Sequence, residues 1–248
     1  MQRAERRQQP GAARIGKTTA DLMKRQRQSI LAQLRQRSIT RDVADMIEQP
    51  FNLARWIREF SIGIRPVLHD VMGEAGAQSM DDLGVGINFD LFDPNVINAL
   101  EKQVQRFARE VNETTWDRLK DSLGAGYEAG ETVDQLAERV NAVMGDRIAS
   151  SGETIARTES NITHSNADIL SWKQSGVVGG KEWLAALDDR TRESHVSAHG
   201  QIVGLDEPFN VGGHRMQGPG LGGPASEVVN CRCAMTAVLD MDMPGWEG

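Results

Sequence analysis

The 248-residue sequence is poor in cysteine and contains only Cys231 and Cys233. Two thiols cannot form a disulfide framework, so we expect the protein to arise in a reducing cytoplasm. No stretch approaches the roughly 18 apolar residues that a transmembrane helix needs, so we expect no such helix, and no membrane is expected among the partners. No apolar run follows the basic N-terminus (Arg3, Arg6, Arg7), so we expect no secretory signal.

Aromatic residues are also scarce, at 5% of the chain. The core must therefore depend mainly on Leu, Ile, Val, Met and Ala. A chain of this length can bury such a core in one large domain or two smaller ones.

Positive charge is concentrated in residues 1–41, which carry a net +9 against −16 for the remainder. This asymmetry predicts an anionic partner for the N-terminal arm, whereas the alternative is an ordinary solvated helical face. We expect this partner to be DNA, and the competing hypothesis is an acidic protein surface. With no aromatic residue in 1–50, the arm should contact the DNA backbone, and log affinity should fall against log salt with a slope of about −4 to −5. The C-terminal domain should fold without the arm. The candidate DNA-binding residues are Arg3, Arg6, Arg7, Arg14, Lys17, Lys24, Arg25 and Arg27.

The first half of the chain has a mainly helical pattern. Residues 1–17 have the composition of a disordered arm, and a helix is expected from Thr18 or Thr19 to Pro50. Pro66 suits the first turn of another helix, and the Gly/Asp-rich residues 73–92 are typical of a loop.

Asp93-Pro94 predicts the start of a long amphipathic helix that ends at Gly124. Its apolar face can pack on the protein's own core or on identical helices in a homo-oligomeric ring. Capping boxes at Thr132-x-x-Gln135 and Ser150-x-x-Glu153 predict two more helices.

Beyond Gly176 the pattern becomes mixed, with strands expected at 181–187, 201–203 and within 228–238. The glycine-rich residues 210–226 predict an irregular connection. The fold class is therefore α+β, a helical N-terminal region with long amphipathic helices followed by a small mixed α/β C-terminal domain. The expected divisions are a disordered arm (1–17), a helical region (18–125) and a C-terminal domain (126–248).

Four potential metal ligands lie in two short clusters near the C-terminus: His195, His199, Cys231 and Cys233. Histidines four apart share a helix face and alternate residues share a strand face, so this set suits tetrahedral zinc. Without metal, the histidines are ordinary hydrogen-bonded residues and the cysteines small buried hydrophobes.

A second hypothesis is an enzyme acting on a phosphodiester or nucleotide, with His195 as general base and arginines binding phosphate. The alternative is a structural ion-pair network in which Asp188 pairs with Arg190. The residues concerned are Arg157, Glu159, Asp188, Arg190, Arg192 and His195.

An ordered series of short motifs resembles the C-terminal domain of phage Mu F-like minor head (head morphogenesis) proteins over roughly residues 130–240. The series runs from Ala156-Arg157-Thr158-Glu159-Ser160 through Lys181-Glu182-Trp183 and Asp188-x-Arg190-Thr191-Arg192-x-x-His195 to Gly200-Gln201 and Asn230-Cys231-Arg232-Cys233. The motif residues are Arg157, Glu159, Trp183, Asp188, Arg190, Arg192, Gly200, Asn230 and Arg232.

The resemblance implies a non-enzymatic minor capsid protein of a tailed phage or prophage, acting in head assembly and in DNA packaging or ejection. It implies no catalytic residues. Its expected partners are the portal protein, the scaffold or major capsid protein, and double-stranded DNA. The expected location is the capsid interior near the portal, after assembly in the host cytoplasm.

Overall fold

The computed structural model describes residues 2–36 and 51–243. The chain divides into two compact units. The first, here called the α/β unit, comprises Met1–Ile15, Leu68–Leu100 and Thr154–Gly248. The second, the helical unit, comprises Gly16–Val67 and Glu101–Glu153.

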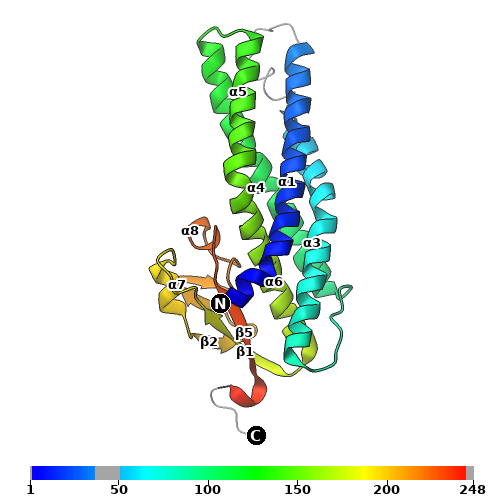
Figure 1. Ribbon diagram of the computed structural model, residues 1–248, viewed down its shortest axis with the longest axis vertical. Coiled ribbons are helices and arrows are strands. Elements are labelled where there is room, and N and C mark those ends of the chain that lie inside the picture. The colour runs from blue at the N-terminus through cyan, green and yellow to red at the C-terminus, as the bar shows by residue number, and fades with distance from the viewer. Residues whose placement is uncertain (1, 37–50, 244–248) are drawn as a thin grey trace. The chain divides into compact units, whose positions relative to one another are not determined.

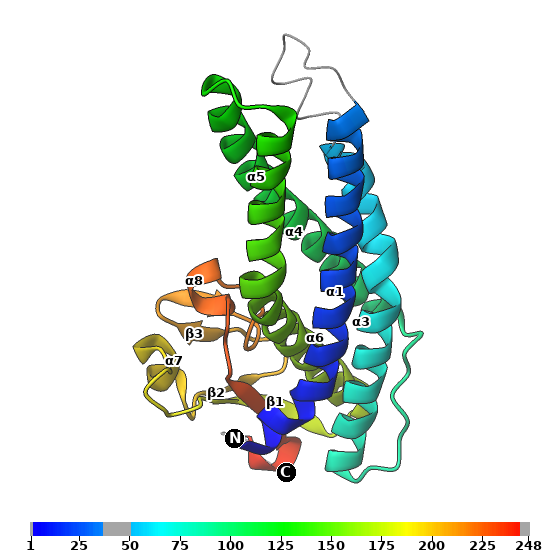
Figure 2. The same ribbon diagram turned by 45° about the horizontal axis from the view of Figure 1, so that its top comes forward.

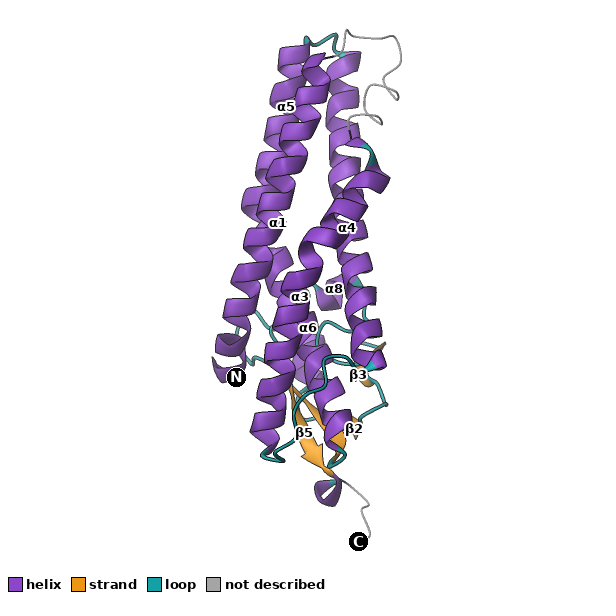
Figure 3. Ribbon diagram, turned by 90° about the vertical axis from the view of Figure 1, so that its right-hand side faces the viewer, coloured by secondary structure: helices purple, strands orange, loops and turns teal. Residues whose placement is uncertain are grey.

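The helical unit contains parts of α1 (Gln2–Gln36), α3 (Leu53–Leu83) and α4 (Pro94–Glu128), together with α5 (Val133–Asp146). Within this unit the helical segments lie side by side (Figures 1 and 3). The buried residues of each helix recur every three or four positions, so each helix turns an apolar face inward. These residues include Leu22, Met23, Ile30, Leu34, Trp56, Phe60, Ile64, Val104, Phe107, Val111, Leu136, Val140 and Met144.

Two close contacts fix the packing of the helical unit. The side-chain amide of Gln26 donates to Asn112 Oδ1 at 2.8 Å, and both residues are fully buried. At Gly63 an added Cβ would lie 2.8 Å from Leu22 Cδ2, so glycine allows α1 and α3 to approach closely here.

The α/β unit contains a three-stranded antiparallel sheet in the order β2-β1-β5. Its central strand is β1 (Val178–Leu184), flanked by β2 (Ile202–Gly204) and β5 (Ala234–Leu239). Trp183 pairs with Met235 and Leu184 with Ala234, which sets the register of β1 against β5.

Helices and a hairpin complete the α/β unit (Figure 2). Most of α6 (Gly152–Ser175) belongs to it, with the short helices α7 (Glu193–Ala198) and α8 (Ala225–Val228). The hairpin pairs β3 (Phe209–Val211) with β4 (His214–Met216). One core joins these elements through residues that include Trp172, Trp183, Phe209, Val211, Met216, Cys231 and Cys233.

The α/β unit also buries charge. Lys181 is fully buried, and its ammonium donates to the carbonyl of Leu205 at 2.8 Å and to Gln217 Oε1 at 3.4 Å. Burial lowers the pKa of Lys181 to about 8. The ammonium also lies 5.4 Å from the centre of the Phe209 ring, a cation–π contact.

The predicted α+β class is confirmed, as are several element starts. Helix α4 begins at Pro94, where Asp93 Oδ1 accepts from the backbone N–H of Asn95 at 2.7 Å. Thr132 and Gln135 form the predicted capping box at the start of α5. Strands β1, β2 and β5 overlap the three predicted strand segments, and the connection over 210–226 includes parts of the β3–β4 hairpin.

The expected disorder of residues 1–17 is not what the structure shows, because α1 already begins at Gln2. Arg, Gln and Ala are good helix formers, and tertiary contacts hold this segment. Ser160 donates to the carbonyl of Gln8 at 2.9 Å, and Ile15 is fully buried. The continuation of this helix beyond Gln36 to Pro50 lies outside the described residues.

Two of the predicted helix boundaries were also wrong. Pro66 lies inside α3, which continues into the expected loop as far as Leu83. Burial of Leu68, Val71 and Met72 on the far side of the proline outweighs the lost hydrogen bond. Helix α4 likewise passes Gly124 and ends at Glu128.

The helix predicted from Ser150-x-x-Glu153 is present as α6, but it does not begin with a capping box. A π-helical turn, Arg147–Ser151, instead connects α5 directly to α6. The apolar face of α4 packs inside the chain's own helical unit, through residues such as Val104 and Phe107. Among the helices of the described residues, none is both long and apolar enough to cross a membrane.

Candidate metal centre

Three potential ligands converge inside the α/β unit: His195, Cys231 and Cys233. His195 Nδ1 lies 3.3 Å from Cys233 Sγ and 3.6 Å from Cys231 Sγ. The three residues are 1–2% exposed. This buried group can hold a metal ion, with two sulfur ligands and one imidazole nitrogen.

The fold delivers these ligands from separate parts of the sequence. His195 lies on α7, whereas the two cysteines immediately precede β5. From α6, the side-chain amide of Asn161 donates to the carbonyls of Cys231 at 2.9 Å and Cys233 at 3.1 Å. Asn161 thereby fixes the cysteine backbone from a third element.

The His195 ring is held on its other side by Glu227. His195 Nε2 lies 2.9 Å from Glu227 Oε2, which also accepts a hydrogen bond from Ser194 Oγ at 2.8 Å. The edge-to-face contact with Trp183, at 5.5 Å between ring centres, further restricts the imidazole. Sequence reasoning missed Asn161 and Glu227, since neither has a recognisable spacing from the cysteines.

The two thiols interact directly. The hydrogen bond between them raises the pKa of Cys231 and lowers that of Cys233, so one of the pair loses its proton much more readily. Both cysteines are free rather than joined in a disulfide. A deprotonated thiol is the form that binds metal.

His199 does not join the group, so the predicted four-ligand set is wrong in this member. It is the C-cap of α7, and its Nδ1 accepts from the backbone N–H of Ala185 at 3.2 Å. The helix ends before a full turn separates the two histidines, which is why the four-residue spacing does not place them on one face.

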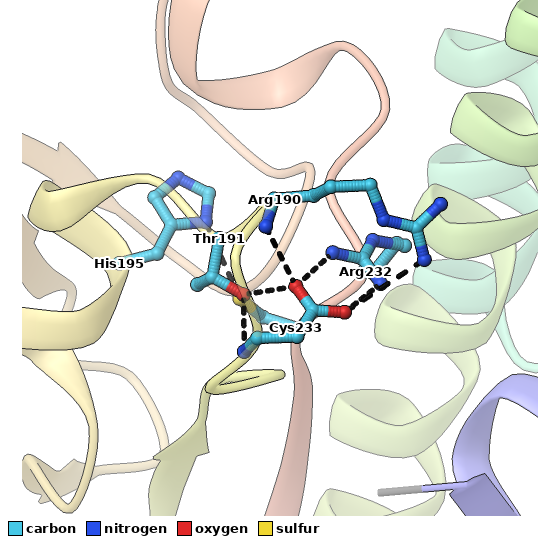
Figure 4. Close-up of polar contacts among 6 residues, drawn as sticks. Arg190, Thr191, His195, Arg232 and Cys233 are labelled. Atoms are coloured by element: carbon cyan, nitrogen blue, oxygen red, sulfur yellow. Dashed lines mark hydrogen bonds and ion pairs between the residues drawn. The ribbon is translucent and has the colours of Figure 1, made fainter.

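The Asp/Arg motif beside the centre forms an ion-pair network (Figure 4). Asp188 accepts from both terminal nitrogens of Arg232, from Thr191 Oγ1 at 3.0 Å and from the Arg190 N–H at 3.1 Å. The Arg232 hydrogen bond holds the pKa of Asp188 well below its usual range. Arg190 and Asp188 also form the predicted ion pair, at 3.8 Å.

The remaining motif residues have structural contacts. Arg192 donates to the carbonyl of Val229 at 2.6 Å, and Arg157 donates to Asn230 Oδ1 at 3.3 Å. Gly200 (φ 79°) and Asn230 (φ 58°) adopt left-handed backbone conformations that glycine and asparagine tolerate best. Two further motif residues, Glu159 and Trp183, are buried.

The candidate DNA-binding residues differ in their surroundings. Arg7 and Arg14 pair with Asp82 and Glu74 in the α/β unit, and Lys24 pairs with Asp21. The structure leaves Arg6, Lys17 and Arg25 exposed and Arg27 half-buried. The side chain of Arg3 lies outside those described.

Residues 117–236 match the Phage Mu protein F like family. This segment is a phage Mu F-like domain. It contains the whole metal centre and all the motif residues, which confirms the resemblance found in the sequence.

Three curated proteins are similar to parts of the chain. NAD(+)–arginine ADP-ribosyltransferase EFV of Enterococcus faecalis (strain ATCC 700802 / V583) is 30% identical over 59% of this chain and 31% of its own length. Minor head protein GP7 of Bacillus phage SPP1 is 36% identical over 50% of this chain and 41% of its own. Uncharacterized protein YqbB of Bacillus subtilis (strain 168) is 25% identical over 72% and 60%. The matched regions thus cover less than two thirds of each relative, and no solved structure matches.

Proposed function

We propose that this protein is a minor head protein of a tailed phage or prophage that acts in head morphogenesis. The observation that carries the proposal is the Mu F-like domain together with 36% identity to the SPP1 minor head protein over half of the chain. In this proposal the protein is packaged in the virion, inside the capsid near the portal. The portal protein is its first partner, with scaffold or major capsid protein as further partners.

Particle composition tests this proposal. Procapsids and virions of the parent phage, purified and analysed by quantitative mass spectrometry, should contain the protein in few copies. Disruption of its gene should lower the yield of infectious particles more than the yield of capsid protein. Absence from both kinds of particle would refute a head function.

For DNA, we propose backbone contacts from two exposed cations of α1 in the helical unit, Lys17 and Arg25. Two other predicted cations, Arg7 and Arg14, already pair with acids of this chain. Each phosphate contact contributes about −0.9 to the slope of log affinity against log salt. Replacing both Lys17 and Arg25 by Gln should therefore flatten that slope by about 2, with little dependence on DNA sequence.

Lys120, also exposed in the helical unit, supplies the control for this experiment. DNA affinity is measured by fluorescence titration at several salt concentrations. In this measurement Lys120→Gln should bind DNA as the unmodified chain does. Equal slopes for the double variant and the unmodified chain would exclude phosphate contacts through Lys17 and Arg25. Deletion of residues 1–41 is unsuitable, because α1 buries Ile15, Leu22, Met23, Ile30 and Leu34.

The enzyme hypothesis has one supporting observation, the similarity to the ADP-ribosyltransferase of Enterococcus faecalis. That match covers 31% of the relative. A general base must reach its substrate, but His195 is 1% exposed and its Nε2 lies 2.9 Å from Glu227 Oε2. These contacts favour a structural role for His195, so His195→Ala should lower stability and remove no activity towards nucleic acid or nucleotides.

We further propose that the metal of the buried centre is zinc. Zinc ligands at about 2.3 Å for sulfur and about 2.0 Å for nitrogen lie roughly 3.5 Å apart in a tetrahedral arrangement. The nitrogen–sulfur distances of 3.3 and 3.6 Å fit this spacing. All three ligands are buried, and the fourth position of a tetrahedral zinc is left to a ligand from outside this group.

Elemental analysis of protein purified without a metal-binding tag tests the metal. About one zinc per chain is expected, together with a loss of stability on chelation. The Cys231→Ser/Cys233→Ser double variant should lose the metal. Substoichiometric zinc with no chelator effect would leave the three residues as a hydrogen-bonded core cluster.

A further inference from the structure

Glu227 lies against the side of His195 that faces away from the thiols. Its Oε2 is 2.9 Å from His195 Nε2, and its side chain is 14% exposed. The same oxygen accepts a hydrogen bond from the Ser194 hydroxyl, so the carboxylate has a fixed orientation. At Gly212 (φ 57°) an added Cβ would lie 3.0 Å from Ser194 Cβ and 3.3 Å from Glu227 Oε1, so glycine leaves room for this arrangement.

This geometry determines where the imidazole carries its proton. An ionised carboxylate has acceptors only, so the nitrogen beside it must be the N–H donor. In the neutral ring Nε2 is then protonated and Nδ1 has the lone pair. Nδ1 is also the nitrogen that faces both sulfur atoms, at 3.3 and 3.6 Å.

We infer that Glu227 is a positioning residue for the metal: it holds His195 in the Nε2-protonated tautomer, so that Nδ1 takes the ion. A ligating histidine commonly donates its second N–H to a carboxylate, which orients the ring and increases its basicity. Glu227, Ser194 and Trp183 together preset the ring before metal binds. The inference rests on the proposed metal-binding function and names the residue that tunes its affinity.

The test is metal affinity in the full-length chain, measured by competition between Zn²⁺-loaded protein and a chromophoric chelator. Glu227→Gln keeps the size of the side chain but loses its charge, and its amide can donate to Nε2, which favours the wrong tautomer. We expect zinc affinity to fall about 10- to 100-fold. Glu193→Gln removes an exposed carboxylate from α7, the helix that carries His195, and should leave the affinity unchanged.

Co²⁺ absorption provides a readout that general destabilisation does not produce. Glu227→Gln saturated with Co²⁺ should keep the thiolate charge-transfer band, because its three ligands are intact, whereas Cys233→Ser should weaken that band. Unchanged zinc affinity in Glu227→Gln would overturn the role of Glu227 and leave the zinc proposal standing. Failure of the unmodified chain to bind zinc would overturn both.

Nitrogen-15 NMR of the unmodified, zinc-loaded chain needs no variant and covers the case in which Glu227→Gln does not fold. With labelled histidine, His195 should show a directly bonded proton on Nε2 and none on Nδ1. A proton on Nδ1, or a metal-bound Nε2, would refute the inference.

Discussion

The helical unit and the α/β unit differ in how far their packing depends on buried polar side chains. In the helical unit, the interior consists largely of aliphatic and aromatic residues in helical stripes, such as Leu22, Phe60 and Phe107. In the α/β unit, Lys181, Glu159, Asn161 and His195 are buried among the apolar residues. The two kinds of contact differ in their geometric demands. The free energy of apolar burial does not depend on direction, whereas hydrogen bonds and metal ligation need particular distances and angles.

The comparison explains why the motif residues gather in the α/β unit. Its strands have three to seven residues, so regular structure alone orders little of this region. Side-chain bonds such as Asp188 with Arg232 and Asn161 with the cysteine carbonyls connect its loops. The long helices need no comparable set of side-chain hydrogen bonds, because the backbone groups of each helix bond to one another.

The largest effect should come from Trp183→Ala in the α/β core. Trp183 is fully buried and makes edge-to-face contacts with His195 and Phe209. We expect a loss of about 3–5 kcal/mol in unfolding free energy, measured by denaturant titration. Phe92, 77% exposed in the same unit, supplies the control, and Phe92→Ala should change little. Similar losses in both variants would show that Trp183 is not a core residue.

Leu22→Ala tests the helical unit in the same way. Leu22 is 1% exposed and fills the space beside Gly63. We expect a loss of about 2–4 kcal/mol, because the close approach of the helices limits collapse of the cavity. Gln28→Ala on the exposed side of α1 is the control. An unaffected Leu22→Ala would mean that Leu22 does not pack in the core of this unit.

Asp168 gives the α/β unit a pH dependence. Burial raises the pKa of Asp168 to about 6, although Arg7 at 4.0 Å and Ser79 oppose the shift. The folded state therefore holds this proton more tightly than the unfolded state. Stability from this group falls as the pH rises from about 4 to about 6, by at most roughly 3 kcal/mol.

Asp168→Asn isolates that contribution from His164, whose pKa burial lowers in the same region. The variant should match the unmodified chain near pH 4 and exceed it in stability above pH 6. Denaturant titrations at pH 4.5 and 7.5 measure the difference. A constant gap between the two proteins at both pH values would contradict the shifted pKa.

A smaller effect is expected at the buried amide pair of the helical unit. Asn112→Ala leaves the Gln26 amide without its acceptor, at a cost of about 1–3 kcal/mol. Gln26→Leu/Asn112→Leu should recover part of the loss, because it removes both polar groups. If the double variant is less stable than Asn112→Ala, the pair contributes more to stability than the hydrogen bond between its two side chains.

Sequence reasoning predicted best where the signal was local. The Asp93-Pro94 start of α4 and the Thr132 capping box depend on neighbouring residues alone, and both were confirmed. Predictions for residues 1–17 and for Pro66 failed, because contacts with distant residues outweighed composition and the proline penalty. Thiol chemistry identified Cys231 and Cys233, but no local pattern identified Glu227 or Asn161.

The sequence by itself determined the α+β class, the Mu F-like motif series and the donor types of the metal centre, because these follow from local periodicity and side-chain chemistry. Only the tertiary structure decided which histidine meets the thiols. His195 lies on α7 and points at Cys231 and Cys233, while His199 caps that helix and bonds to Ala185. Spacing along the chain does not show which of the two histidines reaches the thiols. The pairing of β1 with β5 and the early end of α7 distinguish them.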